Sequence, residues 1–218
     1  MKKIMFNDEF LLTKAVLDGR KTQTRRVVPQ SEMDKINLFQ KEYYELTFDK
    51  LEGVELINHY YFVEKRGRLP YQIGEVVAVA QSYCAIAEEL ENCNNATCAA
   101  HYEKNVQKAS EYISWMGHPG FNNKLFVAAD MMIHQIRITD VRVERLQDIS
   151  DADCIKEGIQ TFYYGDCKFP PDGYTFDDGK SHFNSPREAF AHLINKVSKK
   201  DVWNENPYVF VYDFELVK

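Results

Sequence analysis

The first helical pattern of the chain is short and lies close to its beginning. It places four apolar residues on one side at helical spacing, namely Leu11, Leu12, Ala15 and Val16. Asn7 or Asp8 can cap the start, and Gly19 stands where a left-handed C-terminal cap is expected. We therefore predict a helix that ends just before Gly19.

Two later segments carry stronger signals for the start of a helix. Ser150 opens a helix that runs through Glu157, with Asp153 as capping partner and Gly158 at its end. The run Ser185-Pro186-Arg187-Glu188 combines a capping serine, a proline in the first turn and a glutamate three residues after the serine. The second helix has an apolar side formed by Phe190, Leu193, Ile194 and Val197.

Strand patterns are found in four places. The segment 74–82 is rich in β-branched and small residues, and 208–217 alternates tightly enough to predict the last strand. The segment 134–146 also alternates, but its phase slips near Asp140, which predicts a bulge or a tight bend. The aromatic run 60–63 predicts a further strand that leads into a turn.

The remaining segments show weaker patterns. Residues 31–50 have no clean period, 84–123 have helical character and are interpreted as an insertion, and 161–184 are expected to form a long loop. Helices and strands are interleaved without a βαβ rhythm, which favours an α+β barrel over a doubly wound sheet. We expect one domain over residues 1–218.

Composition narrows the classes of function. The formal net charge of −6 argues against a protein that coats nucleic acid indiscriminately, because such binding scales with the phosphates neutralised by Lys and Arg. A local basic site on an acidic body remains compatible with a short or small ligand. We see no signal peptide and no membrane-spanning stretch, and we expect a cytoplasmic protein without a membrane partner.

The chain has five cysteines, which we expect to be reduced. Cys84, Cys93 and Cys98 could be combined with His101 into a zinc site, but their spacing matches no common zinc motif. We therefore expect no metal and no cofactor, and we interpret Cys154 as structural.

Basic residues are most concentrated in Gly19-Arg20-Lys21-Thr22-Gln23-Thr24-Arg25-Arg26, which holds four cations and two threonine hydroxyls. This octapeptide begins where the first helix stops, and the Val27-Val28-Pro29 run after it favours an extended backbone. One interpretation is an anion-facing site. The alternative is a solvated charged loop that merely follows a core helix.

The octapeptide and three later blocks, taken in order, resemble the ASCH-domain family, in particular its uncharacterised phage and prophage branch. The later blocks are 74–79, 136–149 and 203–211. The resemblance implies a PUA-like pseudobarrel of mixed strands flanked by helices, with a ligand cleft beside the first helix. It also implies that the basic segment lines this cleft, which makes Arg20, Thr22, Arg25 and Arg26 candidate ligand-binding residues.

In one compact branch of that family, an amidohydrolase removes the acetyl group from N4-acetylcytidine. The resemblance places its lysine, threonine and glutamate on Lys21, Thr24 and Glu157. A threonine hydroxyl needs a base to become a good nucleophile, and a lysine serves once its pKa is lowered by burial or by neighbouring cations. Positions 21 and 24 point to opposite faces of a regular strand, so they can converge only across a turn or a helix end.

Where many phage-type relatives show Arg-Glu-Thr-Trp, this chain has Ala80-Gln81-Ser82-Tyr83, so its ligand preference is expected to differ. Gln81 and Tyr83 could hydrogen-bond to a base and stack on it, or Tyr83 could simply be buried. Three hypotheses follow. The first is a protein that binds RNA or a modified nucleoside or nucleotide through the basic cleft, the second is an amidohydrolase acting on N4-acylated cytidine, and the third is a ribonuclease.

Overall fold

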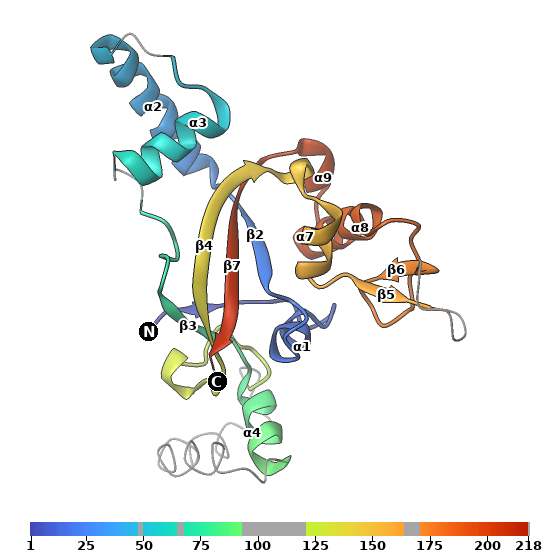
Figure 1. Cartoon of the computed structure of the whole chain (residues 1–218). Helices are drawn as coiled ribbons and strands as arrows, with labels where there is room; N and C mark the ends of the chain where they lie inside the picture. Colours follow the sequence, from blue (N-terminus) through green and yellow to red (C-terminus); the bar gives the residue numbers. More distant parts are fainter. Residues whose placement is uncertain (48–49, 65–67, 93–120, 164–170, 218) are drawn as a thin grey trace.

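The computed structural model describes residues 1–47, 50–64, 68–92, 121–163 and 171–217. The strands of its main sheet, in spatial order, are β1 (Lys3–Ile4), β3 (Val76–Val79), β4 (Gln135–Arg145), β7 (Tyr208–Val217) and β2 (Gln23–Val27). β1 pairs with β3 in parallel and the other pairs are antiparallel, so the sheet is mixed (Figure 1). The α+β class with flanking helices is confirmed. Within the described residues the sheet is open, with β1 and β2 at its edges, and is not closed into a barrel.

The long strands β4 and β7 form the centre of the sheet, and their pairing contains the predicted bulge. The register shifts between Ile138 and Asp140, and both Thr139 and Asp140 are exposed. Because two successive residues face outward there, the apolar side chains before and after the bulge remain on the buried face. Those side chains are Ile136, Ile138, Val141 and Val143.

Helix α1 (Leu12–Leu17) ends at the predicted left-handed glycine, since Gly19 has a φ of 72°. Its start differs from the prediction. Leu11 occupies the N-cap position with a φ of 56° and no side-chain cap. The Asn7 side chain instead accepts a hydrogen bond from the Phe10 amide at 3.1 Å, one turn earlier, and so orders the approach to the helix.

Three helices lie together on the side of β2 (Figure 1), namely α7 (Asp151–Lys156), α8 (Pro186–Ser198) and α9 (Val202–Glu205). Both predicted caps are confirmed. Ser150 Oγ accepts from the Asp153 amide at 3.1 Å, and Ser185 Oγ accepts from the Glu188 amide at 3.1 Å. These side chains satisfy amides that have no partner within the helix, which fixes where α7 and α8 begin.

Between β2 and β3, the structure shows a helix that the sequence pattern did not indicate and corrects one expectation. Residues 31–50 lie largely in α2 (Gln30–Thr47), whose pattern was weak because only Ile36 and Phe39 are buried. The expected strand at 60–63 is wrong. Those residues follow α3 (Gly53–Asn58) within the π-helical turn η1 (His59–Val63), where Tyr61 packs edge-on against Phe210 at 5.0 Å between ring centroids. Tertiary packing of the aromatic rings outweighs their strand propensity here.

The segment expected as a long loop, 161–184, contains a second, two-stranded sheet. β5 (Gln160–Phe162) pairs antiparallel with β6 (Gly173–Thr175). The expected insertion opens with α4 (Tyr83–Asn92), while Cys93, Cys98 and His101 fall outside the described residues. The short 3-10 turns are η2 (Ala129–Met131) and η3 (Leu146–Asp148). In the described part of the chain, none of the helices combines the length and apolar character needed to span a membrane.

Candidate active site

The chain turns back on itself between α1 and β2, and this turn aims Lys21 at the end of α7. The amides of Arg20 and Lys21 both donate to the Ala15 carbonyl at 2.9 Å, which folds the segment against α1. The Thr22 amide donates to the Lys156 carbonyl at 2.9 Å, which ties the start of β2 to the last turn of α7. Residues 21 and 157 are therefore brought together by backbone hydrogen bonds.

Lys21 and Glu157 form a buried ion pair. Lys21 Nζ lies 2.5 Å from Glu157 Oε2 and also donates to the Glu157 backbone carbonyl at 2.7 Å. The two residues are only 2% and 4% exposed, so their contact is shielded from solvent. Gly158 follows with a φ of 107°, and a Cβ there would lie 3.7 Å from Lys21 Cβ. A glycine thus lets the chain leave α7 in this conformation beside Lys21.

Burial lowers the pKa of Lys21, because removal from water disfavours the ammonium form. The Glu157 carboxylate acts in the opposite direction, and the positive charges of Arg26 and Arg25 lower the pKa further. The pKa of Lys21 lies below its usual value of 10.5 as a result. A neutral amine, which can accept a proton, is therefore more accessible to Lys21 than to a solvated lysine.

Thr24 lies on β2 opposite Tyr212 of β7 and is 5% exposed. It lines the same cavity as Lys21 and Glu157. Lys21 precedes the first residue of β2, Gln23, so positions 21 and 24 do not lie on opposite faces of one regular strand, and both side chains line the cavity. No hydrogen bond joins the Thr24 hydroxyl to another of the described residues.

The shared cavity has a volume of about 60 Å³. This is room for a few water molecules and is well below the ~300–1,000 Å³ of pockets that enclose a whole drug-sized ligand. Its polar lining consists of Asn7, Lys21, Thr24, Arg25, Arg26 and Glu157. Its apolar lining consists of Met5, Phe6, Leu12, Phe190, Leu193, Ile194 and Val197. The arrangement suits a small group with one polar and one apolar end.

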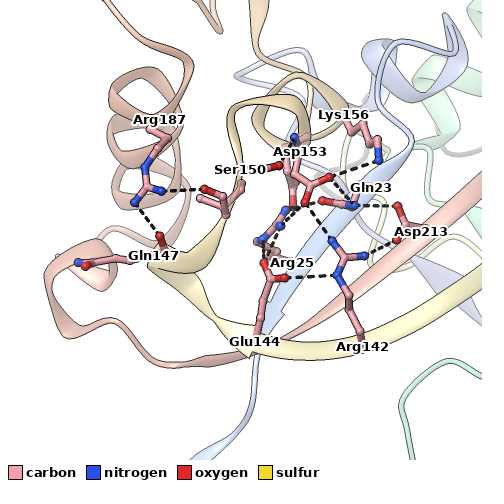
Figure 2. A network of polar contacts seen from close by, with 12 residues as sticks. Gln23, Arg25, Arg142, Glu144, Gln147, Ser150, Asp153, Lys156, Arg187 and Asp213 are labelled. Atoms are coloured by element: carbon pink, nitrogen blue, oxygen red, sulfur yellow. Dashed lines mark hydrogen bonds and ion pairs between the residues drawn. The ribbon is translucent and has the colours of Figure 1, made fainter. Parts of the chain in front are cut away.

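Arg25 is buried, and all three nitrogens of its guanidinium contact side chains of the protein (Figure 2). Its Nη1 donates to Glu157 Oε1 at 3.1 Å and to Gln23 Oε1 at 2.6 Å. Its Nε and Nη2 donate to Glu144 Oε1 at 2.9 Å and 2.6 Å, and Nη2 also lies 3.4 Å from Asp153 Oδ2. Arg25 and Lys21 therefore do not face solvent, and the interpretation of the octapeptide as a solvated loop is wrong for these two cations.

The other predicted ligand-binding residues of the octapeptide lie closer to the surface. Arg20 pairs with Asp18 at 3.2 Å, with 37% of its side chain exposed. Arg26 lines the cavity, donates to the Met5 carbonyl and stands 5.9 Å from the centre of the Phe6 ring. Thr22 is half-buried, and its carbonyl accepts from the Phe214 amide at 2.9 Å.

The structure does not bring Gln81 and Tyr83 to this cavity. Gln81 lines a separate, open cavity of about 540 Å³, where its Nε2 donates to Glu89 at 2.9 Å. Tyr83 begins α4 and packs against a small second core around Ile86 and Met131. Their role in ligand binding stays a prediction.

Two groups of site residues were not predicted from the sequence. Phe190 and Leu193 of α8 line the cavity, although their apolar spacing indicated only a core face. Glu144 and Asp153 hold Arg25, but a single carboxylate on a strand or in a helix cap gives no sign of a partner over a hundred residues away.

Cys154 is buried in α7, and burial raises the pKa of its thiol to about 12. The thiol is therefore protonated and poorly reactive at neutral pH, which fits a structural role. The residues that the structure describes contain no cluster of three or more metal-ligating side chains. The zinc alternative involved Cys93, Cys98 and His101, which lie outside those residues.

Comparison with known proteins adds little to this geometry. No family model and no curated protein matches the chain. A search of solved structures found a high-resolution crystal structure of an ASCH domain from Lactobacillus crispatus JV V101, with 12% sequence identity and a TM-score of 0.33. The alignment covers 97% of this chain and 75% of that chain. A likeness this distant carries no information about activity, so the site is interpreted from its own geometry.

Proposed function

We propose that the protein is an amidohydrolase that removes the acyl group from a small N-acylated nucleobase or nucleoside of the N4-acetylcytidine type. The observation that carries this proposal is the buried Lys21–Glu157 pair at 2.5 Å, which shares one small cavity with Thr24. An amine with a lowered pKa and a hydroxyl that lacks a hydrogen bond to any described residue line the same cavity, which supplies a base and a nucleophile for catalysis by threonine.

The proposed reaction uses these residues in turn. Neutral Lys21 takes the proton of Thr24 while the threonine oxygen attacks the amide carbonyl carbon. The C–N bond then breaks, and the leaving amine takes the proton from the Lys21 ammonium. Water then attacks the acyl-threonine ester with Lys21 again as base, the bond between the acyl carbon and the Thr24 oxygen breaks, the Lys21 ammonium returns its proton to that oxygen, and the carboxylic acid leaves. Glu157 stabilises the ammonium form of Lys21 between the proton transfers, and the Arg26 guanidinium is placed to stabilise the oxyanion.

The size of the cavity bears on which part of the substrate enters it. About 60 Å³ accommodates a carbonyl with a short alkyl group but not a complete nucleoside. We therefore place the acyl group among the apolar side chains of α8 and the base at the mouth of the cavity. This placement keeps water away from the reacting carbonyl until the amine has left.

Binding of RNA or of a modified nucleoside without turnover is the second candidate. It is favoured by the two short hydrogen bonds from Lys21 Nζ to Glu157, since this pattern also suits a permanently charged ammonium. The burial of Arg25 and Lys21 speaks against contacts with several phosphates, because such contacts need accessible cations. The described residues add no observation in favour of a ribonuclease.

Incubation of the protein with N4-acetylcytidine, followed by chromatography for cytidine, tests the first proposal. We expect turnover by the wild type and by Thr24→Ser, which keeps the hydroxyl. We expect Thr24→Val to lose about 10³-fold or more in kcat, because it keeps the shape of threonine and removes the nucleophile. Absence of cytidine at high enzyme concentration would retire this substrate. Calorimetric titration of nucleosides and short RNA into the wild type and Arg26→Ala then tests the second candidate.

A further inference from the structure

We infer that Arg25 is a positioning residue of this site, which holds the Glu157 carboxylate so that one of its oxygens stays on Lys21. This inference rests on the proposed hydrolase function. It adds Arg25 as a residue that lines the cavity and acts through its hydrogen bond to Glu157.

The two oxygens of Glu157 are divided between two cations. Oε2 lies 2.5 Å from Lys21 Nζ, and Oε1 accepts from Arg25 Nη1 at 3.1 Å. A carboxylate held at both oxygens cannot rotate about its last torsion without breaking a charge-assisted hydrogen bond. Arg25 therefore fixes the direction in which Lys21 meets Glu157, and with it the position of the Lys21 nitrogen in the cavity that Thr24 also lines.

Arg25 is itself held by residues from three elements (Figure 2). Gln23 of β2, Glu144 of β4 and Asp153 of α7 all accept from its guanidinium. The planar guanidinium directs its donors along fixed lines, so these contacts define its orientation as well as its place. A lysine at this position would be a point charge on a flexible stem and could not reproduce the fork.

Arg142 of β4 provides a matched control in the same network. It contacts Glu144 at 3.3 Å, Asp153 at 3.0 Å and Asp213 at 2.6 Å. It makes no contact with Glu157 among the described residues, and its side chain is 35% exposed. A change at Arg142 therefore affects two of the carboxylates that Arg25 contacts, Glu144 and Asp153, but leaves the hydrogen bond from Arg25 to Glu157 in place.

The test compares Arg25→Lys with Arg142→Lys in steady-state assays on N4-acetylcytidine. We expect Arg25→Lys to lower kcat by about 100-fold with KM within about threefold, since small misplacement of a reacting group costs rate rather than binding. We expect Arg142→Lys to keep kcat within about threefold at a similar melting temperature. Equal losses in both variants, or full kcat in Arg25→Lys, would overturn the inference.

A second variant covers the case in which Arg25→Lys fails to fold. Glu144→Gln keeps Arg25 and weakens its anchor at a side chain that is 18% exposed. We expect kcat to fall by about 10-fold with the melting temperature changed little, and an unchanged kcat would count against positioning.

A titration that needs no turnover separates this inference from the proposed function. NMR of isotope-labelled lysine follows the titration of the Lys21 ammonium. The charged groups that face this ammonium are Glu157 at the end of α7 and the cations Arg25 and Arg26 of β2. Arg25→Gln removes a positive charge that lowers the pKa of Lys21, so the pKa should rise, and Arg142→Gln should leave it in place. If the wild type hydrolyses nothing, the proposed function fails. An unmoved Lys21 titration in Arg25→Gln would also refute the inference.

Discussion

At the scale of single residues, the site depends on charged side chains that are costly to bury. Each buried cation is paired with a carboxylate, which offsets the cost of removing its charge from water. Lys21 and Arg25 are both nearly inaccessible, and the structure surrounds them with Glu157, Glu144 and Asp153. Burial of an unpaired charge costs several kcal/mol, so removal of one partner is expected to lower the stability of the fold as well as the rate of the reaction. Conservative variants are therefore the informative ones.

A substitution at Gly158 tests whether the backbone conformation next to Glu157 matters for stability and activity. With a φ of 107° the residue adopts a conformation that other residues reach only with strain, so Gly158→Ala should destabilise the protein by about 1–3 kcal/mol. Urea unfolding measures this loss. Because the strain falls next to Glu157 and Lys21, kcat should fall as well.

Gly74→Ala is the control for that variant. Gly74 has a φ of 83°, a Cβ added there would meet nothing within 4 Å, and the residue does not line the cavity. We expect a similar loss of stability with kcat unchanged. A Gly158→Ala variant with full activity would show that the backbone after α7 does not position Glu157.

At the scale of elements, sequence patterns predicted what local signals specify. The alternation of β4 and β7, the bulge at Asp140 and the serine caps of α7 and α8 all depend on residues close together in the chain. The π-helical turn η1 could not be predicted, because its Tyr61 packs against Phe210 from the far end of the sequence.

The same limit applies to the candidate site. Lys21, Thr24 and Glu157 were predicted from a resemblance, and the structure places them around one cavity. The burial of Arg25 could not be predicted, since it depends on pairing with Glu144 and Asp153 across three elements. A basic run in a sequence does not reveal which of its cations meet carboxylates.

The cap of α7 gives a prediction at this scale. The helix has six residues and ends at Lys156, with Glu157 as its C-cap, so it depends on its N-terminal cap and on packing for its stability. Ser150→Ala removes the hydrogen bond to the Asp153 amide and should cost about 1 kcal/mol in the free energy of unfolding. Thermal or urea unfolding measures the loss, and Ser150→Asp, which retains a cap, should restore most of it. Equal stability of all three proteins would contradict this role.

At the scale of the whole molecule, the charge network links α7 to the central sheet and should make folding sensitive to acid. Burial opposes ionisation of Asp153, but Lys156, Arg25 and Arg142 outweigh it and hold its pKa below the usual 3.8. The unfolded chain therefore takes up this proton at a higher pH than the folded chain. The stabilisation is complete above the ordinary pKa and is lost as the pH falls through the lowered one.

Melting temperatures between neutral pH and about pH 3 test this sign. The wild type should lose stability in the acid range, and Asp153→Asn should start less stable and lose less as the pH falls. Parallel curves for the two proteins would show that Asp153 does not contribute to acid sensitivity.

If Thr24 attacks the amide carbonyl with the help of the Lys21–Glu157 pair, as we propose, it carries the acyl group during turnover. The most direct measurement is mass spectrometry of peptides from the protein after acid quench during turnover of N4-acetylcytidine. We expect an acetyl group on Thr24 in the wild type and neither label nor cytidine with Thr24→Val. Cytidine formed at an undiminished rate by Thr24→Val, or no cytidine from the wild type, would contradict the proposal.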